Sequence, residues 1–439
     1  MPRIGGLQRC VNLMPPSSPA PHAADQATPP PETRWYLSGH IAYFLAMGIQ
    51  GVLVPWLVAI VLKETPERVG IAQMVSMLPM LVLIMPGGAT ADRVELRAHL
   101  IRLQIFAALP SLALAIAILM GELSYWVVLA FVLAMSSIGA WIVPARDSIL
   151  TRIAMRSMDG AIPRAVALAT SAQFAAQVVG MLLATLAGVA GALPFLVAHS
   201  VLALSTAYST SRLAPAPAVP RESSGHSRSR EMMEGLSMTL ADPDLRAIMI
   251  LTGLGGVLYI GVFMVIFPLL ARDAYGGGSL EIGLFTAAFF GGIGASSFLL
   301  TRLPEIRRQG RAIMVAMSAG SITMTLVHFQ PPFWAVLVFV LIWGLSAGVS
   351  MSTARAMVQA RAPDSHRGRM LAAFQLAMMG GGPVGSLLAG YVASELGLFD
   401  AILVPPALMT VLWLSVFFLT DLWKAGIHPH IGPDMDTAD

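Results

Sequence analysis

The sequence predicts an all-α membrane protein with twelve transmembrane helices in two pseudo-symmetric six-helix bundles. Three observations lead to this fold class. The 439-residue chain is 56% hydrophobic and only 12% charged, with a mean hydropathy of +0.73, whereas a soluble domain is about 25% charged. The apolar residues gather into runs of about 20, the length that crosses a bilayer as a helix. The basic residues gather in alternate connections between those runs.

The chain begins with a segment that cannot build a core. Residues 1–34 are rich in Pro, Ala and Ser and contain no long apolar run, so a disordered tail is expected. The first apolar run starts at Trp35. It is too long for a cleaved signal peptide and should therefore stay in the membrane.

Twelve apolar runs follow this tail. Proline and glycine inside them do not argue against helix, because neighbouring helices in a bundle satisfy the backbone groups that these residues free. The boundary between the last two runs is the least distinct, because the stretch from Gly397 to Pro405 is short. The expected spans are 37–62, 69–90, 99–120, 124–145, 165–189, 193–211, 247–270, 281–301, 312–330, 333–354, 370–393 and 400–422.

The basic residues predict the orientation and support the number of spans. Of the 27 lysines and arginines, all except Lys63, Arg68 and Arg272 fall in the tails or in the connections after spans 2, 4, 6, 8 and 10. Cytoplasmic loops carry an excess of basic residues, so both termini are expected in the cytoplasm. A missed span would exchange the sides of all later connections and destroy this separation.

A polar stretch divides six spans from six. Residues 212–245 are rich in Ser, Arg and Pro, which predicts a cytoplasmic linker with a short surface helix near 231–240. The expected domains are the tail 1–34, a six-helix bundle 35–211, the linker 212–245, a second six-helix bundle 246–423 and a cytoplasmic tail 424–439.

An internal repeat favours the same division. The ends of spans 4 and 10 share one spacing of small and basic residues. Two parallel halves imply a binding site at their interface, near the middle of the membrane. The matching positions are Gly139, Ala145, Arg146 and Arg152 in the first half and Gly348, Ala354, Arg355 and Arg361 in the second.

The turn between spans 2 and 3 carries the most informative motif. Gly88, Asp92, Arg93 and Arg97 match the G-x-x-x-D-R-x-G-R-R/K motif, and the chain therefore resembles the major facilitator superfamily over about residues 35–423. Two positions depart from the motif, because Glu95 and the following leucine replace its second glycine and its first paired basic residue.

Two shorter motifs narrow the resemblance. Pro144-Ala145-Arg146 follows span 4, and Arg367-Gly368-Arg369 begins span 11. Both are similar to the branch of bacterial exporters that includes the enterobactin exporter and its drug-efflux relatives. The resemblance implies secondary transport by alternating access.

The resemblance also implies a conformational latch on the cytoplasmic side. Asp92 is expected to bind the start of span 11, because a carboxylate accepts charge-assisted hydrogen bonds from helix N-termini and arginines. Arg146 and Asp147 are expected to tune this contact. The latch residues are Gly88, Asp92, Arg93, Arg97, Arg146, Asp147, Arg355, Arg367 and Arg369.

By the same resemblance, spans 1, 4, 7 and 10 should line a substrate cavity. Further glutamines, Gln173, Gln177 and Gln375, are interpreted as helix-to-helix hydrogen bonding, because a buried glutamine needs partners. The glycines of spans 5 and 11 are interpreted as close helix packing. The expected cavity residues are Gln50, Ser136, Ser137, Trp141, Tyr259 and Trp343.

The placement of acidic residues bears on the cargo. None of the 24 lies in the middle third of an expected span, and a charge there would cost about 2.5–3.5 kcal/mol. A cationic drug site usually contains a buried carboxylate, so a neutral, amphipathic or anionic cargo is favoured, siderophore-like or drug-like. Proton coupling would have to use a carboxylate near the interface, Asp147 first and Asp92 second.

The remaining expectations concern what the protein is not. No nucleophile motif, phosphate-binding loop or metal-ligand spacing is present, so no enzyme activity, cofactor or metal is expected.

The expected partners are a small-molecule substrate, the lipid bilayer and protons, without nucleic acid, and the chain should act as a monomer in the bacterial inner membrane. The alternatives are a lipid-like cargo flippase of the same fold and a non-transporting sensor or assembly protein.

Overall fold

The computed structural model describes residues 31–91, 93–158, 160–218, 228–304, 306–363 and 366–426. Every regular element in these ranges is a helix. Twelve helical segments are long and apolar enough to cross a membrane. The fold class expected from the sequence, including its number of spans, is therefore confirmed.

The first six spans come from α1 to α7, which we call the first half. The first span is α1 continued by a π-helix, η1. The elements are α1 (Pro31–Pro55), η1 (Trp56–Val61), α2 (Pro66–Ala91), α3 (Leu96–Leu119), α4 (Tyr125–Ser157), α5 (Ile162–Ala184), α6 (Ala187–Ala190) and α7 (Leu193–Ser211).

The last six spans come from α9 to α17, which we call the second half. Its first span also contains a π-helix, η2. The elements are α9 (Pro243–Gly261), η2 (Val262–Ile266), α10 (Phe267–Asp273), α11 (Ser279–Leu300), α12 (Gln309–Val327), α13 (Phe333–Arg361), α14 (Arg367–Gly380), α15 (Gly382–Leu396), α16 (Leu398–Ala401), α17 (Val404–Leu419) and a 3-10 helix, η3 (Leu422–Lys424).

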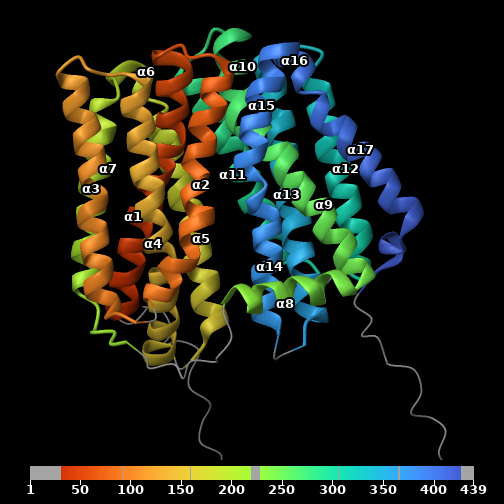
Figure 1. Ribbon diagram of the computed structural model, residues 1–439, viewed down its shortest axis with the longest axis horizontal. Coiled ribbons are helices and arrows are strands. Elements are labelled where there is room, and N and C mark those ends of the chain that lie inside the picture. The colour runs from red at the N-terminus through yellow and green to blue at the C-terminus, as the bar shows by residue number, and fades with distance from the viewer. Residues whose placement is uncertain are drawn as a thin grey trace, which may run out of the picture.

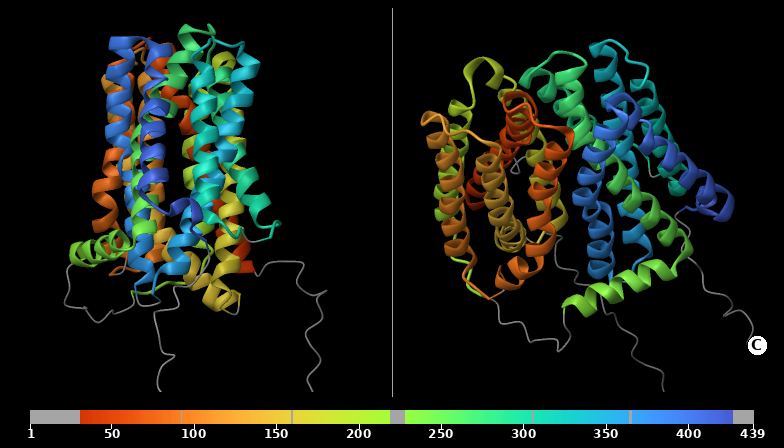
Figure 2. Two further views of the ribbon diagram at one scale, coloured as in Figure 1. Left: turned by 90° about the vertical axis from the view of Figure 1, so that its right-hand side faces the viewer. Right: turned by 45° about the horizontal axis from the view of Figure 1, so that its top comes forward.

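The two halves stand side by side (Figure 1). The connections after α2, α4 and α7 share one end of the molecule, which we call the basic end; the other is the opposite end. A further helix, α8 (Arg228–Ala241), lies crosswise at the basic end and packs against α14 and α9 (Figure 2). The linker between the halves therefore contains a helix docked on the second half.

Two helices run further toward the basic end than their apolar runs. α4 reaches Ser157 and α13 reaches Arg361, past the expected ends at 145 and 354. Hydropathy marks only the part of a helix that lipid surrounds, so a helix that continues into water is cut short by it. Arg146 and Arg355 therefore lie on helices rather than in loops.

The closest helix crossing of the first half joins α1 to α5. A Cβ atom on Gly48 would lie 2.2 Å from the carbonyl oxygen of Gln177, and one on Gly180 would lie 2.2 Å from that of Leu45. Only glycine allows the two backbones to come so near. The interpretation of the span 5 glycines as packing residues is therefore confirmed. In the second half, α9 crosses α15 in the same way, at Gly261.

Candidate functional site

The two halves meet at the opposite end. There α2 packs along α15 and α5 packs along α11. The first contact is again a close one, because a Cβ atom on Gly70 would lie 2.7 Å from the carbonyl oxygen of Ser386. These crossings form a continuous seam between the halves.

Polar contacts reinforce this seam. Arg272 Nη1 donates to the carbonyl oxygens of Ala59 and Glu64, at 2.9 Å each. Ser279 Oγ donates to the carbonyl oxygen of Thr185 at 2.6 Å and accepts from the Gly188 N–H at 2.6 Å.

A further seam contact joins α2 to α15, because the Ser394 hydroxyl donates to the Glu67 carboxylate. Among pairs of described residues, the hydrogen bonds between the halves all lie at this end. The structure is thus closed at the opposite end.

Two π-helices lie beside the seam at corresponding places. η1 follows α1 and η2 follows α9. A π-helix shifts the backbone ladder by one residue and is common at functional sites. The carbonyl oxygen of Ala59, within η1, accepts from Arg272 across the seam. The widened turn of span 1 is therefore part of the contact that closes the protein.

A cavity of about 210 Å³ lies next to the seam, between the halves. Helices α1, α2, α4 and α5 supply one wall, and η2, α10 and α11 supply the other. The lining residues are Met47, Gln50, Gly51, Val54, Pro55, Gln73, Ser76, Val132, Gln177, Met181, Phe263, Met264, Phe267, Pro268, Ile282, Phe285, Thr286 and Phe290.

The two walls differ in chemistry. None of the described lining residues is an Asp, Glu, Lys, Arg or His. The first half contributes three glutamines and the second half contributes four phenylalanines. A cavity of this kind can offer neutral hydrogen bonds on one side and an apolar, aromatic surface on the other.

Of the cavity residues expected from the sequence, Gln50 lines this cavity. Ser136 is on α4, and its hydroxyl is placed to donate to the Leu133 carbonyl oxygen of its own helix at 3.2 Å and to the Val75 carbonyl oxygen of α2 at 3.4 Å. Ser137 and Trp141 line a different, apolar hollow between α3 and α4, with exposed side chains such as Phe106 beside them. Span 4 thus presents these two residues toward span 3.

Tyr259 and Trp343 lie behind the cavity wall. The Tyr259 hydroxyl is 2.6 Å from Ser321 Oγ, between α9 and α12. Trp343 is only 4% exposed, and its ring lies 5.9 Å from those of Phe263 and Phe267. Trp343 therefore supports the phenylalanines that face the cavity, and the Tyr259 ring packs against Trp343, with 5.7 Å between the ring centroids.

Sequence reasoning missed several lining residues. Gln73 of α2 was not considered, and Gln177 of α5 was interpreted as helix-to-helix bonding, yet both line the cavity. The signal available was the presence of three glutamines in spans 1, 2 and 5. The direction in which each faces depends on how the helices cross, which the sequence does not display.

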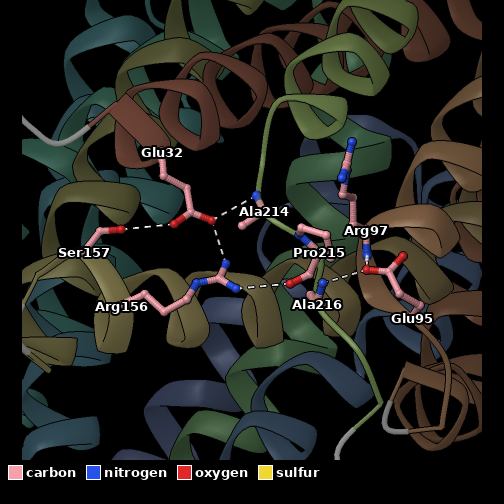
Figure 3. Close-up of polar contacts among 8 residues, drawn as sticks. All are labelled: Glu32, Glu95, Arg97, Arg156, Ser157, Ala214, Pro215 and Ala216. Carbon is pink, nitrogen blue, oxygen red and sulfur yellow. Dashed lines mark hydrogen bonds and ion pairs between the residues drawn. The ribbon is translucent and has the colours of Figure 1, made fainter.

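At the basic end, Glu95 stands where the motif has its second glycine, and its carboxylate accepts hydrogen bonds from backbone N–H groups. It precedes α3 and accepts hydrogen bonds from the N–H groups of Arg97 at 3.2 Å and Ala98 at 2.5 Å, as an N-cap. It also accepts from the N–H of Ala216, beyond α7, at 2.7 Å (Figure 3). Arg97 Nη2 donates to the carbonyl oxygen of Ser211 at 2.6 Å.

The electrostatics of Glu95 follow from these contacts. Partial burial acts to raise the pKa of the Glu95 carboxyl, but the N–H donors of Ala216, Ala98 and Arg97 outweigh it and hold the pKa below its usual value. The glutamate that replaces the motif's glycine is thus held as an anion. It binds the chain that leaves α7 to the start of α3.

A second glutamate completes this clamp on the segment after α7. Glu32 accepts from Arg156 at 2.6 Å, from the Ser157 hydroxyl at 3.1 Å and from the Ala214 N–H at 3.2 Å (Figure 3). Arg156 also donates to the carbonyl oxygen of Pro215 at 3.2 Å. The starts of α1 and α3 and the end of α4 therefore hold residues 214–216.

Arg146 is buried inside the first half. The residue is only 5% exposed, and its Nη2 atom lies 2.6 Å from His40 Nδ1. The guanidinium carbon lies 4.0 Å from the Tyr43 ring centroid and 5.1 Å from that of Phe44. Imidazole and aromatic faces thus stabilise this cation. Asp147, the next residue, is exposed.

The matching arginines of the repeat hold the two ends of the linker. Arg152 donates to the carbonyl oxygen of Pro217 at 2.6 Å. Arg361 pairs with Asp242 at 3.1 Å and with Asp244 at 2.7 Å, at the start of α9. The repeat therefore places equivalent residues of α4 and α13 where the linker leaves one half and joins the other.

The remaining latch residues are distributed over both halves. Arg369 pairs with Glu234 of α8 at 2.8 Å, and Arg355, Arg367 and Arg93 have exposed side chains. Gly88 lies near the end of α2. Asp92, the centre of the expected latch, lies outside the described residues, so the latch stays a prediction.

A twelve-span bundle with a cavity between two similar halves defines a secondary transporter of the major facilitator type. The chain belongs to the transmembrane secretion effector family, whose model matches residues 35–426. The resemblance noted from the sequence is thereby confirmed, and the protein is a multi-pass membrane transporter and not an enzyme.

Two relatives are efflux proteins. The multidrug efflux pump Tap of Mycolicibacterium fortuitum is 28% identical over 396 residues, which cover 85% of this chain and 92% of the relative. Macrolide efflux protein A of Streptococcus pyogenes is 25% identical over 173 residues, which cover 38% of this chain and 42% of the relative.

Solved structures share the fold. The nucleoside transporter NupG has a TM-score of 0.67 at 12% identity and covers 89% of this chain and 99% of its own. The human organic anion transporter MFSD10 has a TM-score of 0.62 at 16% identity and covers 88% of this chain and 99% of its own. At these identities the likeness shows the architecture alone.

Proposed function

We propose that this protein exports small amphipathic, drug-like molecules across the bacterial inner membrane by alternating access. The observation that carries the proposal is the uncharged cavity between the halves, directly beside a closed seam. Such a cavity accepts molecules that partition into membranes. The efflux pumps among the relatives support the direction of transport.

The charge distribution supports an orientation in which the basic end faces the cytoplasm. The structure then corresponds to a state that is closed toward the outside. An exporter loads its cargo in that state. Opening outward requires the seam to break and the basic end to close, with the halves 35–211 and 246–423 moving as two bodies.

The latch is the second part of this proposal. Asp92 would bind the start of span 11 when the basic end closes, near Arg367 and Arg369. Asp92→Asn should then weaken the outward-open state and slow export, because an amide loses the charge-assisted part of the contact. Distances between spin labels on the two halves would measure the change. An unaltered distance distribution and export rate would exclude the latch.

Proton coupling is the third part. Asp147 is exposed next to the buried Arg146, so it can exchange protons while sensing a fixed cation. Export by Asp147→Asn should lose its dependence on the proton gradient but keep cargo binding. A variant that remains fully coupled would assign the proton to another group.

The direct test uses purified protein in proteoliposomes loaded with a fluorescent amphipathic dye. Dye flux that depends on an imposed proton gradient supports the proposal. Transfer of a labelled phospholipid without dye flux would replace it with the flippase alternative. The absence of both fluxes from correctly folded protein would favour a sensor or assembly role.

A further inference from the structure

The cavity is divided between the halves in a way that selects cargo. Gln50, Gln73 and Gln177 come from α1, α2 and α5, whereas Phe263 and Phe285, among the facing aromatics, come from η2 and α11. Amides bind by hydrogen bonds and aromatic rings bind apolar faces. A ligand that fills the cavity must therefore present one polar edge and one apolar face.

Gln50 is distinguished among the three glutamines. Its side-chain oxygen is buried and, within the described part of the chain, has no hydrogen-bond partner. Gln73 is 4% exposed and its oxygen has a neighbour, the Ser76 hydroxyl at 3.5 Å. An acceptor without a donor carries a desolvation cost. The Gln50 residue as a whole is only half-buried and lines the cavity, so a turn of its terminal amide would bring this oxygen to the cavity, where a ligand N–H or O–H would remove that cost.

The position of Gln50 is set by close packing. Gly48, two residues before it, touches the backbone of Gln177 at the crossing of α1 and α5. Two of the three amides therefore stand on helices that are fixed against each other. A polar edge presented by this wall has a defined geometry.

We propose that the cavity binds uncharged molecules that combine an aromatic or polycyclic face with a hydrogen-bond donor at one edge, and that Gln50 accepts the hydrogen bond from that donor. This inference rests on the proposed function, because it names the class of cargo for the same cavity. Gln50 acts here as a specificity residue.

The absence of ionisable groups from the described lining excludes strong binding of localised charges. A cation or an anion would lose its hydration on entering the cavity and would find no group of opposite charge there, which is costly in an apolar surrounding. Neutral donors such as aromatic amines and hydroxyls lose less on entering. They regain the lost hydrogen bond from Gln50 while their rings contact the phenylalanines.

The test compares two neutral fluorescent probes, 7-amino-4-methylcoumarin and 7-dimethylamino-4-methylcoumarin. They share one ring system, and only the first has N–H donors. Binding is measured with the full-length protein in lipid nanodiscs, as the ratio of the two dissociation constants. The two probes differ in hydrophobicity, but this difference enters the ratio equally for every variant. A change in the ratio between variants therefore reports the hydrogen bond.

Gln50→Leu should shift the ratio about tenfold against the amino probe, the effect of one buried hydrogen bond. Gln375→Leu, on an exposed position of α14, should leave it unchanged. A second variant, Gln50→Glu, should bind a trimethylammonium coumarin more tightly than the wild type does, because it adds the missing anion.

The outcomes separate the inference from the proposed function. Equal ratios in the wild type and Gln50→Leu overturn the inference, as does failure of the wild type to bind either coumarin. If the protein exports dye but does not prefer the amino probe, the transport proposal is retained and the inference about Gln50 is overturned. Selective binding without any flux would retain the site and overturn export.

Discussion

The guanidinium of Arg272 donates a hydrogen bond across the seam to the carbonyl oxygen of Ala59, over 2.9 Å. Arg272 ends span 7, and Ala59 lies in the π-helix that ends span 1. The same nitrogen also reaches the carbonyl oxygen of Glu64. One side chain of the second half therefore fastens two backbone positions of the first half where the protein is closed.

Replacement of Arg272 should release this end. Hydrogen bonds from a charged group are worth about 1.5–3 kcal/mol, so Arg272→Ala should raise the population that is open at this end at least about tenfold. The measurement is the rate at which a membrane-impermeant thiol reagent labels Ile282→Cys, a buried cavity position near the seam. The labelling is done in a Cys10→Ser background, because Cys10 is the single native cysteine.

Arg302→Ala is the matched control for that experiment. Arg302 lies at the other end of α11 and contacts the ring of Phe298. Its removal should leave the labelling rate within twofold of the wild type. Equal rates for the wild type and Arg272→Ala would show that the seam closes without this contact.

The crossing of α1 and α5 should tolerate no side chain at Gly48. A methyl group there would lie 2.2 Å from a backbone oxygen, whereas at Gly51 its nearest neighbour is a methionine methyl at 3.9 Å. Gly48→Ala should cost about 1–3 kcal/mol through overpacking, and Gly51→Ala should cost much less. Thermal unfolding in detergent compares the two variants. A similar loss for both would indicate that general helix propensity, not the crossing, dominates.

Glu95 should make stability depend on acid pH. Since its pKa is lowered in the folded protein, the stabilisation is present above the unfolded-state pKa, about 4.3. It is lost as the pH falls through the lower folded-state pKa. Glu95→Gln should lower stability by about 1 kcal/mol near neutral pH and flatten this acid dependence.

The thermal midpoint measured between pH 7 and the acid limit of the detergent sample tests the role of Glu95. Glu122→Gln, at an exposed position between α3 and α4, provides a comparison with the same chemical change. An acid profile for Glu95→Gln that follows the wild-type profile would assign the dependence to other carboxylates.

The junction of the linker with the second half should depend on Arg361. Its side chain is 15% exposed and pairs with Asp242 and Asp244. Arg361→Ala should destabilise the protein by about 2 kcal/mol, because two charged acceptors lose their donor. Arg355→Ala, on an exposed face of the same helix, should stay within about 0.5 kcal/mol. The free energy of unfolding in denaturant distinguishes the two.

The fold was predictable from hydropathy and from the basic residues. Spans had to be about 20 residues long and alternate in orientation. Twelve apolar runs with arginines between alternate pairs therefore left few possible values for the number and order of the spans. The ends of α4 and α13 were placed too early. A helix that leaves lipid continues without any change in backbone pattern, and Arg146 and Arg361 therefore looked like loop residues.

The site was predictable in kind more than in detail. The sequence has no carboxylate in the middle of a span, and the described lining of this cavity is uncharged. Gln50 belongs to that lining, while its role in binding cargo stays a prediction. Ser137 and Trp141 face α3 instead, and Gln73 was not anticipated. Which face of a helix looks inward depends on its rotation and tilt against its neighbours, and apolar lipid allows apolar residues on every face. The pattern that identifies the inner face of a soluble helix is then missing.

The division of the cavity walls between the halves sets a limit on how tightly cargo can be held. In the proposed transport cycle the halves separate along the cavity and the amide wall and the aromatic wall move apart, so cargo would leave one set of contacts without any rearrangement inside either half. A molecule that matched both walls too well would resist this motion and hold the protein in one state. Tight two-sided ligands of this cavity should therefore act as inhibitors, and turnover should favour cargo of moderate affinity.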